Sequence, residues 1–243
     1  MIYISLSTIP KRLKNINKSI ESLLQQTQKP DKIFINIPYK YKRFEEIIDD
    51  KEIPKFSSKL VEIVRCEDSG PGTKLLGSLH KFKKDSLVIL ADDDHSYEDY
   101  MVEKFYYFYS RAPENAYSFY VHPLRDFGIG QGADGFAINT NSLTGVRNFY
   151  DAIVKNHKDL ILNDDLWISY FLYFFKKNKI LSLQEHIKKK DGIKLPLIYK
   201  IHNEQAGLIS TYGKNLDEAI EKKDEIADKS ITYMIEKTKG LSF

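Results

Sequence analysis

The chain has 243 residues, 42% of them hydrophobic, which is enough for one large α/β domain or two small domains with an apolar core. Its formal net charge of +3 is too small to indicate a nucleic-acid partner. The single cysteine, Cys66, excludes an intramolecular disulfide and a zinc site built from cysteines, so we expect a reducing compartment.

The N-terminus and the hydropathy of the whole chain bear on localisation. In M-I-Y-I-S-L-S-T-I-P-K-R the basic residues follow the apolar run, which is the reverse of a signal peptide. No run approaches about 18 apolar residues, the length that a membrane-spanning helix requires. We therefore expect a cytoplasmic protein, with peripheral contact at the inner face of a membrane as an open alternative.

The first part of the chain alternates between strand and helix patterns. Apolar runs predict strands over 2–6, 32–37, 60–64 and 87–91. Helical spacing of apolar residues predicts helices over 14–26 and 73–82, and a short helix over 44–50. Because strands that alternate with helices pair in parallel through right-handed crossovers, the pattern predicts a mostly parallel sheet.

Three consecutive aspartates, Asp92, Asp93 and Asp94, follow the strand over 87–91 directly. Side chains alternate along an extended chain, so Asp92 and Asp94 should project to one side and Asp93 to the other. Adjacent carboxylates repel one another, and a divalent cation relieves this; hard oxygen ligands suit Mg²⁺ or Mn²⁺. A helix cap or turn is the alternative, because aspartate favours both.

Two further segments should lie at the same edge of the sheet as the aspartates. Ser7 and Thr8 end the first strand, and residues 68–74 with their Ser-Gly-Pro-Gly turn follow the third. Such sheets bind ligands beyond the carboxyl ends of their strands. Residues 1–43 contain nine basic and two acidic residues, which favours a phosphorylated ligand bridged by a metal, although a solvated basic face gives the same pattern.

The middle of the chain carries a glycine-rich segment between two strand patterns. An aromatic-rich helix over 99–110 and a strand over 116–121 precede it. Gly128 to Gly135 matches the letters of a dinucleotide fingerprint, but a strand pattern over 135–139 follows where the fingerprint needs a helix. We reject that match, and the glycines then serve either close backbone approach or a flexible loop.

The last part of the chain contains two amphipathic helix patterns. Asn163, Asp164 and Asp165 precede the first, over 166–176; one cap explains one of them, not all three. A strand is expected over 197–201, and the second helix spans 215–239 before Gly240.

Taken in order, five segments resemble the nucleotide-sugar glycosyltransferases of the GT-A fold, especially small family-2-like bacterial and viral enzymes. The matching stretches are S-L-S-T-I-P-K-R at 5–12, S-L-L-Q-Q-T-Q-K-P-D-K-I at 22–33, I-L-A-D-D-D-H-S-Y at 89–97, G-A-D-G-F-A at 132–137 and N-D-D-L-W-I-S at 163–169. The resemblance implies one GT-A-like domain over 1–243, with a mostly parallel twisted sheet, helices on both faces and a C-terminal helical extension. Residues 1–97 would bind the nucleotide, 98–200 would form the acceptor side, and 201–243 would supply the C-terminal segment.

The resemblance also implies a donor site. Ser7, Thr8 and Arg12 would contact the base and ribose, and Lys74 would lie near the diphosphate. Asp92 would contact the ribose or support the metal site, and Asp94 would be the direct metal ligand. Asp93 belongs to the donor site without an assigned role, and His202 is a candidate third metal ligand.

In inverting members an acid at the start of a later helix is the general base, which here is Asp165, with Asp164 as the second choice. The implied activity is a Mn²⁺- or Mg²⁺-dependent transfer of a hexosyl or deoxyhexosyl group from a nucleotide sugar, first of all a UDP-sugar, to a hydroxyl of a glycan. The strand over 32–37 lacks the aspartate with which many family-2 enzymes bind uracil, so the donor base stays open. A sugar-phosphate nucleotidyltransferase and a non-catalytic nucleotide-sugar binding module are the alternatives.

Overall fold

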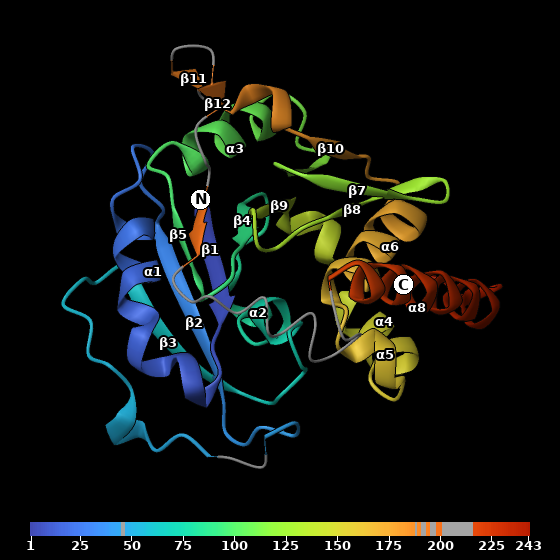
Figure 1. Ribbon diagram of the computed structural model, residues 1–243, viewed down its shortest axis with the longest axis horizontal. Coiled ribbons are helices and arrows are strands. Elements are labelled where there is room, and N and C mark those ends of the chain that lie inside the picture. The colour runs from blue at the N-terminus through green and yellow to red at the C-terminus, as the bar shows by residue number, and fades with distance from the viewer. Residues whose placement is uncertain (45–46, 188, 191–192, 195–197, 201–215) are drawn as a thin grey trace.

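A seven-stranded sheet forms the centre of the computed structural model, which describes residues 1–44, 47–187, 189–190, 193–194, 198–200 and 216–243 (Figure 1). Its strand order is β10-β6-β9-β4-β1-β2-β3. The strands are β1 Ile2–Ser7, β2 Lys32–Pro38, β3 Val61–Cys66, β4 Leu87–Leu90, β6 Ala116–Ser118, β9 Phe136–Asn139 and β10 Ile180–Ser182.

The sheet is mostly parallel, as the alternation of strand and helix patterns predicts. β1 pairs in parallel with β2 and β4, β2 with β3, and β6 with β10. Only β9 runs the other way, between β4 and β6. The carboxyl ends of β1, β2, β3 and β4 therefore meet at one edge, which is where the candidate site lies.

Helices cover both faces of this sheet (Figure 1). The helices α1 (Ile16–Leu24) and α3 (Met101–Tyr109) share one apolar core with the sheet. On the opposite face lie α2 Thr73–Leu76, α4 Val146–Phe149, α5 Lys158–Ile161, α6 Asp164–Lys176 and α8 Leu216–Thr238. A π-helical turn at Tyr150–Val154 continues α4. The expected α/β architecture with a C-terminal helix is confirmed.

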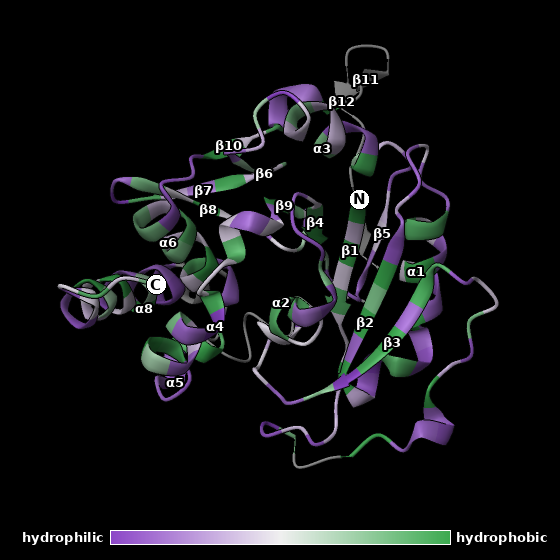
Figure 2. Ribbon diagram, turned by 180° about the vertical axis from the view of Figure 1, so that it is seen from behind, coloured by the Kyte–Doolittle hydropathy of each residue, from purple (hydrophilic) through white to green (hydrophobic). Residues whose placement is uncertain are grey.

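The apolar strand patterns correspond to strands buried on both faces. In β1, Ile4 faces the core of α1 while its neighbour Tyr3 faces the core of α2, and both are at most 2% exposed. Figure 2 shows hydrophobic residues along β2 and β3. Such continuous apolar runs are typical of strands in parallel sheets covered by helices.

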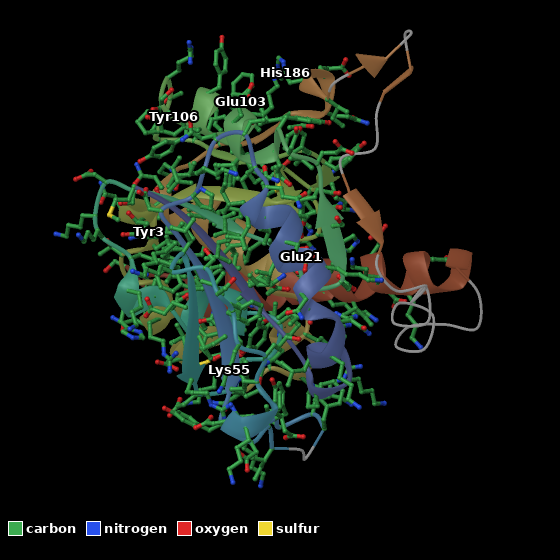
Figure 3. All side chains as sticks on the ribbon, turned by 90° about the vertical axis from the view of Figure 1, so that its left-hand side faces the viewer. Tyr3, Glu21, Lys55, Glu103, Tyr106 and His186 are labelled. Carbon is green, nitrogen blue, oxygen red and sulfur yellow. The ribbon has the colours of Figure 1, made fainter. Side chains whose placement is uncertain are left out.

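The aromatic-rich helix α3 packs on the sheet through one side. Phe105 is fully buried, whereas Tyr106 and Tyr107 are exposed. Figure 3 marks Glu103 and Tyr106 on the outer side of this helix. The helix therefore packs on the sheet through its buried side, which includes Phe105, as expected. No helix in the part of the chain that the structure describes is both long and apolar enough to span a bilayer.

Three small two-stranded sheets complete the fold. The hairpin β7 (Val121–Leu124) and β8 (Phe127–Gly130) projects beside α6. The strand β5 (His95–Tyr97), directly after the aspartates, pairs antiparallel with β13 (Ile198–Lys200). The third sheet joins β11 Lys189–Lys190 and β12 Ile193–Lys194. Short 3-10 helices lie at Pro10–Asn15, Asp50–Glu52, Leu79–Lys81, Thr140–Leu143 and Gln184–His186.

Several element bounds differ from the expected ones. The helix expected over 73–82 ends at Leu76 and resumes only as the 3-10 turn Leu79–Lys81, because Gly77 and Ser78 are weak helix formers. The strand expected over 116–121 divides into β6 and β7. Of the short helix expected over 44–50, residues 45–46 lie outside the described residues, and the helical turn that forms is at Asp50–Glu52.

Candidate functional site

A cavity of about 320 Å³ lies at the carboxyl ends of β1, β3 and β4. The three segments expected to converge there do so. Nine residues predicted for the site line the cavity: Ser7, Thr8, Arg12, Lys74, Asp92, Asp93, Asp94, Asp164 and Asp165. The remaining candidate, His202, lies outside the described residues.

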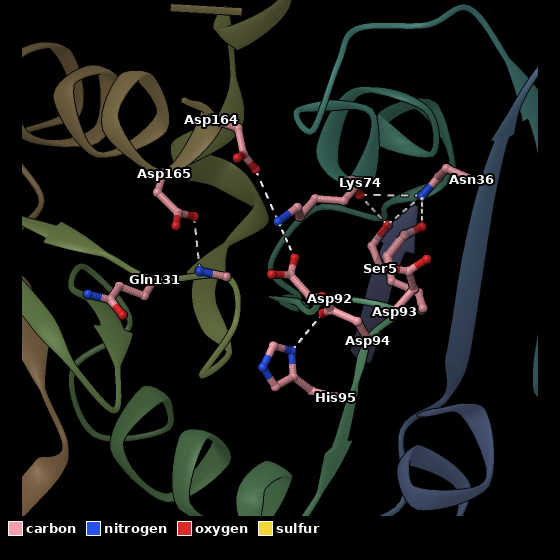
Figure 4. Close-up of polar contacts among 12 residues, drawn as sticks. Ser5, Asn36, Lys74, Asp92, Asp93, Asp94, His95, Gln131, Asp164 and Asp165 are labelled. Carbon is pink, nitrogen blue, oxygen red and sulfur yellow. Dashed lines mark hydrogen bonds and ion pairs between the residues drawn. The ribbon is translucent and has the colours of Figure 1, made fainter. Parts of the chain in front are cut away.

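Lys74 is the buried cation at the centre of the site (Figure 4). Its Nζ lies 2.5 Å from Asp92 Oδ1 and 3.2 Å from Asp164 Oδ2. Burial alone would lower the pKa of Lys74, but Asp164 and Asp92 outweigh it and raise this pKa well above its usual value. The lysine is therefore charged, and it joins the aspartates after β4 to the acids that begin α6.

A buried polar network fixes the short helix that carries Lys74. Ser5 Oγ, on β1, donates to the backbone carbonyl of Lys74 at 2.5 Å and lies 2.8 Å from Ser78 Oγ. Asn36 Nδ2, on β2, donates to Ser5 Oγ at 2.9 Å. Gly77 packs directly on this amide, because a Cβ there would lie 2.5 Å from Asn36 Oδ1. The sheet thus determines where Lys74 projects.

Arg12 pairs with two of the three aspartates. Its Nη1 lies 3.0 Å from Asp93 Oδ1 and its Nη2 lies 3.1 Å from Asp94 Oδ2. Asp93 is only 3% exposed, and this burial raises its pKa to about 6 although Arg12 opposes the shift. The strand β4 ends at Leu90, and Asp93 and Asp94 lie in a turn, so the alternation expected of an extended strand does not place them, and all three aspartates line the cavity.

Asp92, Asp94 and His95 form a candidate metal centre. One ligand atom from each residue lies within 4.8 Å of the others. His95 Nδ1 is 2.7 Å from Asp94 Oδ1. Burial would raise the pKa of Asp94, but His95 and Arg12 together lower it to about 2, so this carboxylate is ionised, with one oxygen beside each of these two groups. Two carboxylates and an imidazole suit Mn²⁺, and with waters they also accommodate Mg²⁺.

The two acids at the start of α6 do not cap the helix. Asn163 occupies the N-cap without a side-chain cap bond, and Asp164 is paired with Lys74. Asp165 Oδ1 accepts a hydrogen bond from the backbone N–H of Gly132 at 2.9 Å. Burial first, and the neighbouring Asp164 second, raise the pKa of Asp165 to about 7. Such a carboxylate can exchange a proton near neutral pH.

The glycine-rich segment brings its backbone against this group of charges. A Cβ on Gly132 would lie 2.7 Å from Lys74 Nζ and 3.2 Å from Asp165 Oδ1. Of the two interpretations left open by the sequence, the structure favours close backbone approach, here to side chains of the site. The strand β9 follows the segment, whereas a dinucleotide fingerprint would be followed by a helix, so the rejection of that fingerprint is confirmed.

A second cavity, of about 380 Å³, meets the first at Asp92 and Asp165. Its other walls come from the β7–β8 hairpin, the glycine-rich segment and α8. Asp165 therefore stands between two spaces, one lined by the aspartates and Arg12, the other lined by the C-terminal helix.

The sequence matches no protein-family model and no curated protein. Solved structures resemble the fold at low identity. The 2-C-methyl-D-erythritol 4-phosphate cytidylyltransferase IspD of Francisella tularensis is 12% identical, with a TM-score of 0.51 over 87% of this chain and 97% of that one. The 4-diphosphocytidyl-2C-methyl-D-erythritol synthase of Anaerococcus prevotii is 13% identical, with a TM-score of 0.50 over 87% and 95%. TarS of S. aureus is 12% identical, with a TM-score of 0.50 over 99% of this chain.

The chain has a GT-A-like fold. It spans 44% of the TarS chain, so the comparison concerns one part of that protein. At these identities the likeness concerns the architecture alone.

The sequence analysis did not identify some residues of the candidate site. His95 follows the three aspartates directly and begins the strand β5, which places its imidazole beside Asp94. The sequence analysis did not predict this strand, and so it did not identify His95. Ser5 and Asn36 lie inside apolar strands, where nothing marks them as supports of Lys74. Gly132 was recognised as part of a glycine-rich segment, not as the partner of Asp165.

Proposed function

We propose that this protein is a metal-dependent glycosyltransferase that moves a sugar from a nucleoside-diphosphate sugar to a hydroxyl group of a glycan, with inversion. The observation that carries the proposal is the position of Asp165, which lines both cavities and adjoins the Lys74–Asp92 pair. A donor in the first cavity and an acceptor in the second would meet beside this carboxylate.

The first cavity suits a diphosphate bound through a metal. Asp92, Asp94 and His95 would hold Mn²⁺ or Mg²⁺, which supplies neutralisation of the charge that grows on the leaving diphosphate. Lys74 and Arg12 already form ion pairs with Asp92 and Asp94. A metal bound to these carboxylates would compete for the same carboxylate oxygens, which would leave the two basic side chains able to pair with phosphate oxygens. A UDP-sugar remains the first donor to test.

Asp165 suits the role of general base. The acceptor hydroxyl must lose a proton as it attacks the sugar, and a carboxylate with a pKa near the working pH accepts that proton effectively. The hydrogen bond from Gly132 holds Oδ1 in place, which leaves Oδ2 for the acceptor. Asp164 is occupied by Lys74 and is the weaker candidate.

A sugar-phosphate nucleotidyltransferase is the alternative within the same architecture. That activity usually needs a glycine-rich loop after the first strand, whereas a 3-10 helix without glycine, Pro10–Asn15, follows β1 here. Product analysis separates the two activities, since a glycosyltransferase releases a nucleoside diphosphate and a nucleotidyltransferase releases pyrophosphate.

The proposal is tested with Asp165→Asn and Asp94→Ala. We expect Asp165→Asn to reduce release of nucleoside diphosphate by about 10²–10⁴-fold, the usual contribution of a general base, and to keep nucleotide affinity within a few-fold. Asp94→Ala should remove the metal dependence of nucleotide binding. Turnover is measured across UDP-, GDP- and TDP-sugars with Mn²⁺, and binding by calorimetry.

Two results would overturn the assignment. Wild-type turnover by Asp165→Asn would remove the base, and full activity in excess chelator would remove the metal. Tight metal-dependent binding of a nucleotide sugar without hydrolysis or transfer would instead indicate a non-catalytic binding module.

A further inference from the structure

We infer that Tyr97 is a positioning residue of the metal centre, because its phenol fixes the backbone from which the Asp92 carboxylate projects. The inference rests on the metal site of the proposed function. It adds to that site a buried residue that lines neither of the two cavities.

The phenol oxygen of Tyr97 bridges the two peptide groups on either side of Asp92. The Asp92 N–H donates to Tyr97 Oη at 2.8 Å, and Tyr97 Oη donates to the Asp92 carbonyl at 3.3 Å. A phenol can make both bonds at once, because its hydroxyl is a donor and an acceptor. The bridge therefore restrains φ and ψ of Asp92, the two backbone torsions that set the direction of its side chain.

This bridge begins where the pairing of β4 with β1 ends. The N–H of Ala91 donates to the Ser5 carbonyl on β1 at 3.1 Å, and the next N–H along the chain, that of Asp92, donates to Tyr97. The chain then turns at residues 93–94. Tyr97 thus continues the support of the backbone from the sheet to the first residue of the metal centre.

Helix α1, which lies beside β5, holds Tyr97 and Asp92 from the other side (Figure 1). The Tyr97 N–H donates to Ser22 Oγ at 3.0 Å, and Ser19 Oγ donates to the Asp92 carbonyl at 3.3 Å. Tyr97 is 4% exposed, and both serines are buried. A satisfied network of buried polar groups is rigid, so the phenol oxygen has a fixed place relative to the sheet.

The orientation of Asp92 depends on this support more than that of Asp94 does. The Asp94 carboxylate lies between Arg12 and His95, at 3.1 and 2.7 Å. The Asp92 carboxylate pairs with Lys74, and a metal bound to it would compete with that lysine. The backbone bridge still determines where the carboxylate points when this pair is broken. Groups that orient metal ligands contribute about 10–100-fold to metal affinity.

The test is Tyr97→Phe, which removes one oxygen and keeps the ring. Binding of Mn²⁺ to the full chain in the presence of UDP is followed by water-proton relaxation, which increases when Mn²⁺ tumbles with the protein. We expect Tyr97→Phe to bind Mn²⁺ about 10–100-fold more weakly than wild type. Ser19→Ala removes the second donor to the Asp92 carbonyl and keeps the phenol, so it should weaken binding by only about threefold.

Tyr117→Phe is the matched control for the loss of a buried phenol oxygen. Tyr117 is 2% exposed, its Oη donates to the Ala112 carbonyl at 2.8 Å, and it lines neither cavity. Both tyrosine variants lose a buried hydrogen bond, so both should melt below wild type without ligand. Only Tyr97→Phe should lose affinity for Mn²⁺.

The inference is overturned if Tyr97→Phe binds Mn²⁺ like wild type, or if Tyr117→Phe loses as much Mn²⁺ affinity as Tyr97→Phe. Should Tyr97→Phe fail to fold, wild-type Mn²⁺ affinity in Ser19→Ala overturns it. A wild-type protein that binds no Mn²⁺ with UDP, GDP or TDP would instead contradict the proposed function, which separates the two failures.

Discussion

Asp165 combines a functional position with an energetic penalty. Its folded-state pKa of about 7 lies above the ordinary value of 3.8, so folding disfavours its ionised form. The resulting loss in the free energy of unfolding is absent below the ordinary pKa of 3.8, grows as the pH rises, and reaches its full size above about pH 7.

From this follows a stability prediction for Asp165→Asn. Asparagine keeps an oxygen for the Gly132 N–H and carries no charge, so the variant should melt several degrees higher than wild type at about pH 8. The difference should shrink as the pH falls and vanish near pH 4. Thermal melts across this range check the prediction, and a constant difference at all pH values would contradict it.

Arg12 is predicted to stabilise the fold mainly through Asp93. Removing it leaves a carboxylate that is 3% exposed without its ion-pair partner, so Arg12→Ala should lower the free energy of unfolding by about 3–5 kcal/mol. Adding Asp93→Asn removes the charge and should recover much of the loss. Denaturant unfolding measures both, with Lys11→Ala, an exposed neighbour, as the control. If the double variant is no more stable than Arg12→Ala alone, the loss of stability does not come from the unpaired Asp93 carboxylate.

Among individual residues, the sequence predicted the acidic side chains of the site but not the buried polar residues that hold Lys74 in place. Asp92, Asp94 and Asp165 stand out because several carboxylates at the ends of apolar segments exceed what caps require. Ser5 and Asn36 could not be found, because a small polar residue within a buried strand has no distinctive pattern until the helix that packs on it is known. The prediction of Asp93 as a donor-site residue also stays open, since the structure shows it buried against Arg12.

The helix α2 is too short to be stable through its own backbone hydrogen bonds, so its contact with β2 contributes most of its stability. It has only four residues, and Gly77 at its C-cap has helical φ and ψ of −63° and −46°. On an open helix surface, Gly→Ala would stabilise by roughly 1 kcal/mol.

Here Gly77→Ala should destabilise the protein instead. The new Cβ would meet three atoms of Asn36 at 2.5–2.9 Å inside the fold, and such overpacking costs about 1–3 kcal/mol. In an Asn36→Ala background the penalty should decrease or change sign. Denaturant unfolding of the four proteins in this cycle gives the coupling. An equal effect of Gly77→Ala in both backgrounds would show that the close contact with Asn36 is not the cause.

Elements with strong apolar patterns were predictable, and elements defined by distant partners were not. The strands β1, β2 and β4 are continuous apolar runs and were found to within one or two residues. The hairpin β7–β8 was missed because glycines at 128 and 130 read as a loop, whereas they make room for Val121 and Phe136. The pairing of β5 with β13 joins segments about one hundred residues apart and has no local signature.

The whole molecule arranges basic and acidic side chains around one cavity, so its ligands should bind together. Mn²⁺ alone would have to displace Lys74 from Asp92 and Arg12 from Asp94, and a nucleoside diphosphate alone would face those carboxylates without a metal. Each ligand supplies the charge that the other needs.

We therefore predict that the increase in Tm with Mn²⁺ and UDP together exceeds the sum of the two separate increases. A ligand that binds only the native state stabilises it by RT ln(1 + [L]/Kd), so cooperative binding appears directly as excess stabilisation. Thermal-shift measurements with each ligand and with both check this. Strictly additive shifts would indicate independent sites.

The reversed strand β9 has a consequence for how the protein is made. β4 lies between β1 and β9, and its residues Leu87 and Ile89 are fully buried. On the ribosome, β1 and β4 can pair before residues 136–139 have been synthesised, and until then β4 is an uncovered apolar edge. The nascent chain thus carries an uncovered apolar edge from the time β4 has left the ribosome until β9 has also emerged.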